Sequence, residues 1–163
     1  ARAVVALARH SASAGIEPVV PILNGAPVAR LLIPRLGMDA IVLEGVDADV
    51  LNAGPGHVPG SAYPGERGNA VISAHRDRHF AHLGEIRVGD TLSTESGTHH
   101  DRWVVISKRV IDADAPALFR TTTATLTLTT CWPIRYLGTA PERLIVTARP
   151  LRQTGSFASA TSD

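Results

Sequence analysis

The sequence has one cysteine, Cys131, among 163 residues, so an intramolecular disulfide is excluded. It has no run of the roughly 18 consecutive apolar residues that a membrane-spanning helix needs, and no N-terminal signal-sequence pattern. It also lacks a charge imbalance, because 16 Lys and Arg oppose 15 Asp and Glu without a block of one sign. This balance argues against a nucleic-acid surface. Because the sequence starts at Ala1 rather than Met, we expect a further segment upstream of it, and a membrane anchor could lie in that segment.

The sequence does contain enough apolar material for one folded domain. Hydrophobic residues make up 44% and charged residues 19%, which is typical of globular proteins and not of disordered ones. A chain of this length buries most of its apolar surface in a single core. We expect this domain over residues 30–152. Residues 153–163 are small and polar, and we expect them to form a disordered tail.

The first 29 residues differ in composition from the predicted domain. Residues 1–14 are rich in Ala and Arg, which favours a short helix. Pro18, Pro21 and Pro27 follow and favour an extended linker. We therefore expect residues 1–29 to form an N-terminal helical and extended stalk. The apolar residues of its linker are expected to lie against the domain: Val19, Val20 and Ile22.

The predicted domain contains short apolar or alternating runs separated by Gly and Pro. Such runs are typical of the strands of a closed barrel or a sandwich, so the fold class is predicted to be mostly β. The strands are expected at residues 29–34, 39–45, 69–75, 90–94, 102–111, 125–130 and 143–149. Two short helices are also expected, at residues 47–54 with Asp47 as the N-cap and at residues 78–86.

Three residues at the ends of predicted strands are of the types that acyl transfer by a thiol requires. Cys131 follows an alternating strand and precedes Trp132 and Pro133, which end it, so the thiol is expected at a barrel rim. His75 ends the strand "NAVISAH", and Arg143 begins the last strand, 12 positions after Cys131. Taken singly, a lone Cys is usually a small buried hydrophobe, and a strand-end His or Arg is usually solvated.

Together the three residues supply the parts of a catalytic site. Cys131 would attack a carbonyl as the thiolate, and His75 would protonate the leaving amine. Arg143 would bind the developing oxyanion or a backbone carbonyl of the substrate. Because each residue has a distinct part in one reaction, the set favours catalysis more strongly than any single member does.

Five motifs make the sequence resemble the sortase family of cysteine transpeptidases: "TLTTCWP", "ISAHRD", "ERLIVTA", "IPRLGMDAIVLEG" and "GPGHVPGSAYPGERGNAV". The resemblance covers about residues 30–149, and the motifs occur in the sortase order. It implies an eight-stranded sortase-type β-barrel in which Cys131, His75 and Arg143 are catalytic. Within the family, the sequence looks closest to the class D and E sortases or to the single-sortase group of Gram-negative bacteria.

The resemblance also implies a reaction and its partners. Sortases cleave a C-terminal LPXTG-like sorting signal after its Thr, hold the protein as a thioester and transfer it to an amine. We therefore expect protein substrates with such a signal, an amine acceptor of the cell wall or of a pilin, and no cofactor. The expected location is outside the cytoplasm at the membrane. Thr130 and Trp132, which flank the cysteine, are expected to contact the substrate.

Two other functions fit parts of this pattern. An L,D-transpeptidase also joins Cys and His in a β-rich domain, but its motif has His and Gly immediately before the cysteine. This chain has Thr129 and Thr130 there. A non-catalytic extracellular β-barrel would merely pack Cys131 at a strand end. Labelling of the folded protein by a charged methanethiosulfonate would distinguish a reactive thiol from a packed one.

The histidine spacing raises the question of a metal site. His75, His79 and His82 are spaced by four and three, and His99 and His100 are adjacent. Helical i, i+4 spacing can place two histidines on one face. No cysteine or pair of carboxylates completes either set, so no metal site is predicted.

Overall fold

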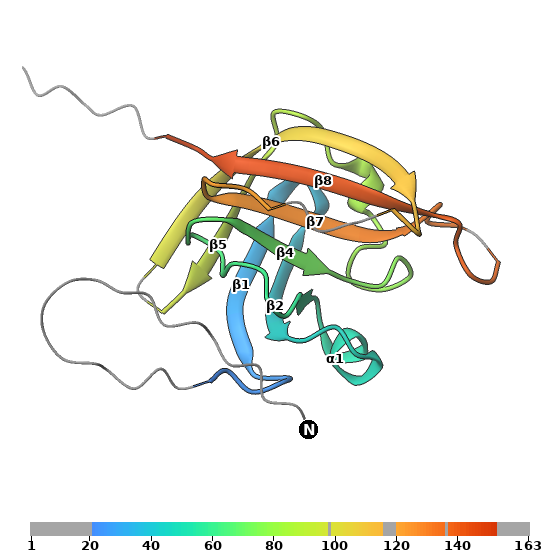
Figure 1. The fold of residues 1–163 in the computed structure, drawn as a ribbon. Coiled ribbons are helices and arrows are strands. Elements are labelled where there is room, and N and C mark those ends of the chain that lie inside the picture. Colours follow the sequence, from blue (N-terminus) through green and yellow to red (C-terminus); the bar gives the residue numbers. More distant parts are fainter. Residues whose placement is uncertain (1–20, 98, 116–119, 136, 153–163) are drawn as a thin grey trace, which may run out of the picture.

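The computed structural model describes residues 21–97, 99–115, 120–135 and 137–152. These residues form eight strands that close into a barrel in the order β1-β2-β3-β4-β7-β8-β6-β5, with β5 pairing back onto β1 (Figure 1). The predicted mostly-β barrel is therefore confirmed. The strands are β1 (Pro27–Ile33), β2 (Met38–Glu44), β3 (Gly56–His57), β4 (Asn69–Ser73), β5 (Thr91–Ser96), β6 (His99–Asp112), β7 (Thr125–Trp132) and β8 (Glu142–Pro150).

Seven of these strands coincide with predicted runs, and the side-chain alternation explains why. In β7, Leu126 and Leu128 point into the barrel, whereas Thr127 and Thr129 point to the other face. Two pairings in the barrel are parallel, β2 with β3 and β4 with β7, and the others are antiparallel. The strand that the sequence did not indicate is β3, because two residues are too few to show a period.

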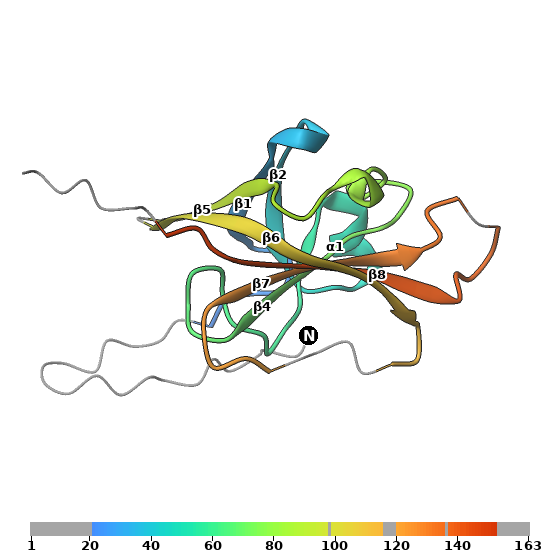
Figure 2. The same cartoon turned by 90° about the horizontal axis from the view of Figure 1, so that it is seen from above.

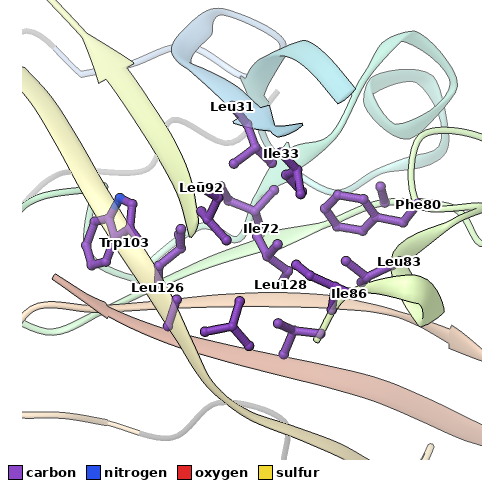
Figure 3. Close-up of a cluster of buried hydrophobic side chains, with 14 of the residues drawn as sticks. Leu31, Ile33, Ile72, Phe80, Leu83, Ile86, Leu92, Trp103, Leu126 and Leu128 are labelled. Carbon is purple, nitrogen blue, oxygen red and sulfur yellow. The ribbon is translucent and has the colours of Figure 1, made fainter. Parts of the chain in front are cut away.

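The core fills the barrel with side chains from nearly every strand (Figure 3). Trp103 of β6 lies at one end of the drawn cluster, and its indole N–H donates to Thr94 Oγ1 at 2.9 Å. Phe80, Leu83 and Ile86 lie at the other end and come from the connection between β4 and β5. All three are fully buried, which stabilises the fold by about 1.5–3 kcal/mol for each side chain.

Helix α1 (Ala48–Ala53) confirms the first helix prediction. Asp47 is its N-cap, and the carboxylate accepts a hydrogen bond from the backbone N–H of Val50 at 3.1 Å. A second short helical turn, η1 (Pro34–Leu36), connects β1 to β2 and was not predicted. The longest helix in the described part of the chain has six residues, and none there has the length and apolar character of a membrane span.

The second predicted helix, at residues 78–86, is wrong as an α-helix. This segment consists of turns and one 3-10 turn, η2 (Leu83–Glu85). Its backbone N–H groups bond three residues back, as in Leu83 to Phe80 and Ile86 to Leu83. The apolar residues at positions 80, 83 and 86 match that period of three, so they can all be buried without an α-helix.

The segment before β1 is hydrogen-bonded to β2 and to the start of α1 from Asn24 onward. The N–H of Gly25 donates to the Glu44 carbonyl at 2.7 Å, and the Asn24 amide donates to Asp47 at 2.7 Å. β1 begins at Pro27, three residues before the predicted domain boundary. Ile22 is half-buried, whereas Val19, Val20, the predicted helix at residues 1–14 and the tail at residues 153–163 lie outside the described residues. The predicted domain division therefore stays a prediction.

Candidate active site

Cys131 lies in β7 and Arg143 in β8, and His75 lies two residues after the end of β4, which is the neighbour of β7 on its other side. Cys131 and Arg143 stand directly opposite each other in the antiparallel pair of β7 and β8. β4 runs parallel to β7, with Ser73 beside Thr129, and the N–H of Ala74 donates to the Thr129 carbonyl at 3.2 Å. Continuing this register by two residues brings His75 next to Cys131, so the three residues form one row across the sheet.

A cavity of about 340 Å³ lies at this row and is lined by His75, Cys131 and Arg143 together. The structure therefore brings together the three residues that the sequence singled out. Cys131 is exposed, unlike the small buried hydrophobe that a lone cysteine usually is. The remaining lining residues come from the segments next to the three strands: Arg76, Asp77, Ala113, Gly138, Thr139, Ala140 and Glu142.

The cavity has charges of both signs. Arg76 and Arg143 are its cations, and Asp77 and Glu142 are its anions. The Nε of Arg143 is buried and has no hydrogen-bond partner in the described part of the protein. Arg76, in contrast, donates from Nη2 to the Gly138 carbonyl at 2.6 Å and from Nη1 to the Pro133 carbonyl at 3.4 Å. The Arg143 guanidinium stands opposite an exposed thiol, where its N–H groups can donate hydrogen bonds to an oxygen atom of a bound acyl group.

Thr130 and Trp132 flank Cys131 but point to the other face of β7. The hydroxyl of Thr130 is buried and donates to the Ala74 carbonyl at 2.8 Å, one residue before His75. Trp132 packs against the core, and a Cβ atom on Gly84 would lie only 3.0 Å from the indole. Thr130 therefore holds β7 to the segment before His75, Trp132 holds it to the core, and neither is among the residues that line the cavity.

Several lining residues were missed by the sequence reasoning. Arg76 and Asp77 directly follow His75, and Glu142 directly precedes Arg143, so adjacency to a candidate residue could have indicated them. The wall formed by Gly138, Thr139 and Ala140 had no such signal. These residues belong to the β7–β8 connection, which projects beyond the end of β7 in both views of the fold (Figures 1 and 2).

Within the described residues, His75 is the one histidine that lines the cavity. The imidazole of His82 lies 3.4 Å from Glu85, and that of His100 lies 3.6 Å from Glu95, all on exposed or partly exposed positions. The Nδ1 atom of His79 is buried and has no partner among the described residues. Within that same part of the chain, no group of three His, Cys, Asp or Glu is arranged to hold a metal ion.

Comparison with known proteins gives one consistent answer. The sortase domain family matches residues 31–151. Sortase D of Bacillus subtilis (strain 168) is 36% identical over 118 residues, which cover 71% of this chain and 60% of that protein.

Solved structures agree with the match in sequence. A Clostridium perfringens sortase D5 transpeptidase has a TM-score of 0.73 at 28% identity, over 80% of this chain and 82% of that one. Streptococcus agalactiae sortase C1 has a TM-score of 0.72 at 27% identity, over 80% of this chain and 70% of that one. The match to the family extends over most of the barrel and includes His75, Cys131 and Arg143. The chain therefore belongs to the sortase family.

Proposed function

We propose that this protein is a cysteine transpeptidase in which Cys131, His75 and Arg143 are the catalytic residues. The observation that carries the proposal is their convergence in one cavity, from β7, β8 and the segment that follows β4. An exposed thiol, an imidazole and a guanidinium supply a nucleophile, a proton donor and an oxyanion ligand. Membership of the sortase family supports the same reaction.

The reaction proceeds by two acyl transfers. The Cys131 thiolate attacks the carbonyl carbon of the scissile peptide bond, and the electron pair of the C=O bond moves to the oxygen, where Arg143 donates hydrogen bonds. When this intermediate collapses, the C–N bond breaks, the His75 imidazolium protonates the leaving amine, and a thioester remains on Cys131. An acceptor amine then attacks the thioester, gives a proton to His75 and expels the thiolate as the new amide forms.

The substrates that fit this chemistry are proteins with an LPXTG-like C-terminal sorting signal. The acceptor is an amine of the cell wall, a pilin lysine or, in the hydrolytic side reaction, water. Membership of the sortase family supports a location outside the cytoplasm at the membrane. A class D type is supported by the B. subtilis and C. perfringens relatives, which are both named as D-type sortases.

The first prediction concerns Cys131 and tests the proposed function. The wild type is incubated with a library of sorting-signal peptides, and the thioester on Cys131 is identified by mass spectrometry. Cys131→Ala should keep the melting temperature of the wild type and lose peptide cleavage. Cleavage above about a thousandth of the wild-type rate would show that Cys131 is not the covalent nucleophile.

A second measurement separates this function from that of a non-catalytic barrel. An active-site thiol in the cavity should react with a charged methanethiosulfonate in the folded state. Resistance of Cys131 to the reagent until the protein is denatured would favour a non-catalytic β-barrel. Peptidoglycan stem peptides serve as the alternative substrates, and cleavage of these in place of sorting-signal peptides would point to an L,D-transpeptidase.

A further inference from the structure

We propose that Arg76 is a positioning residue that fixes the β7–β8 connection as one wall of the cavity, and its kinetic consequence rests on the proposed function. Arg76 follows His75 directly in the chain, so its backbone moves with the catalytic imidazole. Its guanidinium reaches across the cavity to a segment 57 to 62 residues further along the chain. Through Arg76, the wall beyond Cys131 is tied to the segment that carries His75.

Most of the described residues in the β7–β8 connection, next to and within this wall, are exposed to solvent. Leu137 is 98% exposed, and Arg135, Gly138 and Thr139 are exposed as well. Gly138 also has a positive φ of 84°, a conformation that favours glycine and marks a tight turn. Ala140 at the end of the wall is buried, so burial helps to fix that end, whereas for the exposed residues before it hydrogen bonds to carbonyl groups contribute correspondingly more.

The two carbonyl groups that accept hydrogen bonds from Arg76, those of Pro133 and Gly138, lie five residues apart in the β7–β8 connection. Pro133 is its first residue after β7, and Gly138 is the first of the three residues that line the cavity. A planar guanidinium can donate to both at once from Nη1 and Nη2, as observed. The ammonium of a lysine is a compact point charge on a flexible stem, so it would not hold both carbonyl groups in this geometry.

The side-chain contacts of Thr130 and Trp132 on β7 do not position the β7–β8 connection. Thr130 bonds to the Ala74 carbonyl, and Trp132 packs on Gly84, but both side chains point away from the cavity face. They hold Cys131 beside His75, while Arg76 holds the wall that faces them. Loss of Arg76 should therefore widen the cavity without separating the thiol from the imidazole.

This division predicts different responses to a small reagent and to a peptide. Iodoacetamide needs only the exposed thiol, whereas a sorting-signal peptide needs the cavity wall as well. In Arg76→Ala we expect kcat/KM for the peptide to fall at least about tenfold, mainly through a higher KM. The rate of Cys131 alkylation by iodoacetamide should change less than about threefold. Arg76→Lys keeps the charge, and it should lose most of the same kcat/KM.

Arg78→Ala is the matched control, because Arg78 lies two residues further on an exposed turn and is not among the lining residues. Arg78→Ala should keep wild-type kcat/KM. Full peptide turnover in Arg76→Ala would overturn the proposal. Equal losses in peptide turnover and in alkylation would overturn it too, since they would show that Arg76 acts on the thiol.

Limited trypsin digestion tests the same inference without any activity. Arg135 lies inside the clamped segment, so cleavage after it, identified by mass spectrometry, reports how firmly the segment is held. It should be at least about fivefold faster in Arg76→Ala than in the wild type or in Arg78→Ala. Unchanged cleavage would overturn the positioning role of Arg76. If the wild type processes no sorting-signal peptide but this difference in cleavage appears, the proposed function is wrong and the positioning role of Arg76 is still supported.

Discussion

Arg143 is the residue whose surroundings in the cavity are least complete. Its Nε–H is buried without a hydrogen-bond partner in the described residues, although it stands opposite Cys131. An unsatisfied buried donor costs about 1–3 kcal/mol, and more when the group is charged. In the proposed reaction, the Arg143 guanidinium donates hydrogen bonds to the carbonyl or oxyanion oxygen of the substrate at the step that needs stabilisation.

We therefore expect Arg143→Lys to be a poor replacement. The guanidinium can hold two acceptors in fixed directions, whereas an ammonium acts as a point charge. The loss in transition-state stabilisation should be about 2 to 4 kcal/mol, measured as the change in kcat/KM for a sorting-signal peptide. Arg149→Lys, at an exposed position on the same strand, is the control and should keep wild-type turnover. Near-full turnover of Arg143→Lys would reduce Arg143 to a surface charge.

Among the elements, β3 and the segment after it form a polar cluster with β2 around the buried His57. His57 of β3 is fully buried, and its Nδ1 lies 2.8 Å from the Glu44 carboxylate of β2. Its Nε2 lies 2.9 Å from the Ala62 carbonyl, which can only accept a hydrogen bond. The Tyr63 ring stacks on the imidazole with centroids 4.5 Å apart. This cluster fastens the short β3 and the loop after it to β2.

Tyr63 provides a pH test of this cluster. Burial, followed by the negative charge of Glu44, raises the pKa of Tyr63 to about 12. An unfolded tyrosine loses its proton near pH 10, so between about 10 and 12 the folded state binds more protons than the unfolded state. The free energy of unfolding should therefore fall as the pH rises through this range. Tyr63→Phe should remove this part of the pH dependence.

The pKa of Tyr63 can be measured directly. The sequence has two tyrosines, so Tyr63 is the only one left in Tyr136→Phe. In that variant, the ultraviolet absorbance of tyrosinate should rise well above pH 10 while the protein is folded. A titration centred near about pH 10 would contradict the raised pKa.

The elements also show what the sequence could and could not predict. Long runs of alternating apolar and polar residues, such as β7, could be predicted as strands from the sequence. Because Cys131, His75 and Arg143 each end or begin a predicted strand, they could be recognised as a set. The β7–β8 wall could not be predicted, because its position depends on hydrogen bonds from Arg76, distant in sequence. The inward direction of Thr130 follows from the same alternation as Leu126 and Leu128, whereas that of Trp132 depends on β7 continuing past the cysteine.

At the scale of the whole molecule, three carboxylates accept hydrogen bonds in the folded protein that lower their pKa values. A hydrogen bond from Arg30 lowers the pKa of Asp39, and one from Arg35 lowers that of Asp90. The backbone N–H of Val50 lowers the pKa of Asp47 at the start of α1. Each of these groups binds its proton more weakly in the folded state than in the unfolded state.

Acid should therefore destabilise the protein. Below about pH 4 the unfolded state binds more protons than the folded state, so the free energy of unfolding should fall as the pH falls further. In Asp90→Asn, unfolding by urea should depend less steeply on pH between about 4 and 2 than in the wild type. Asp114→Asn, at an exposed position on a turn, is the control. Equal acid dependence in the wild type and in Asp90→Asn would show that the contact with Arg35 does not stabilise the fold.

The last prediction concerns how the N-terminal segment joins the barrel. The described contacts begin just before β1, where Gly25 donates to the Glu44 carbonyl and Asn24 donates to Asp47. Deleting residues 1–26 removes these two hydrogen bonds and the one that the Glu44 N–H donates to the Ala26 carbonyl at 2.8 Å. At about 1 kcal/mol for each, the melting temperature should fall by several degrees in a chain of this size. Deleting only residues 1–14, the expected stalk, should leave it nearly unchanged. Equal shifts in calorimetric scans of the two truncated proteins would refute a division between stalk and linker.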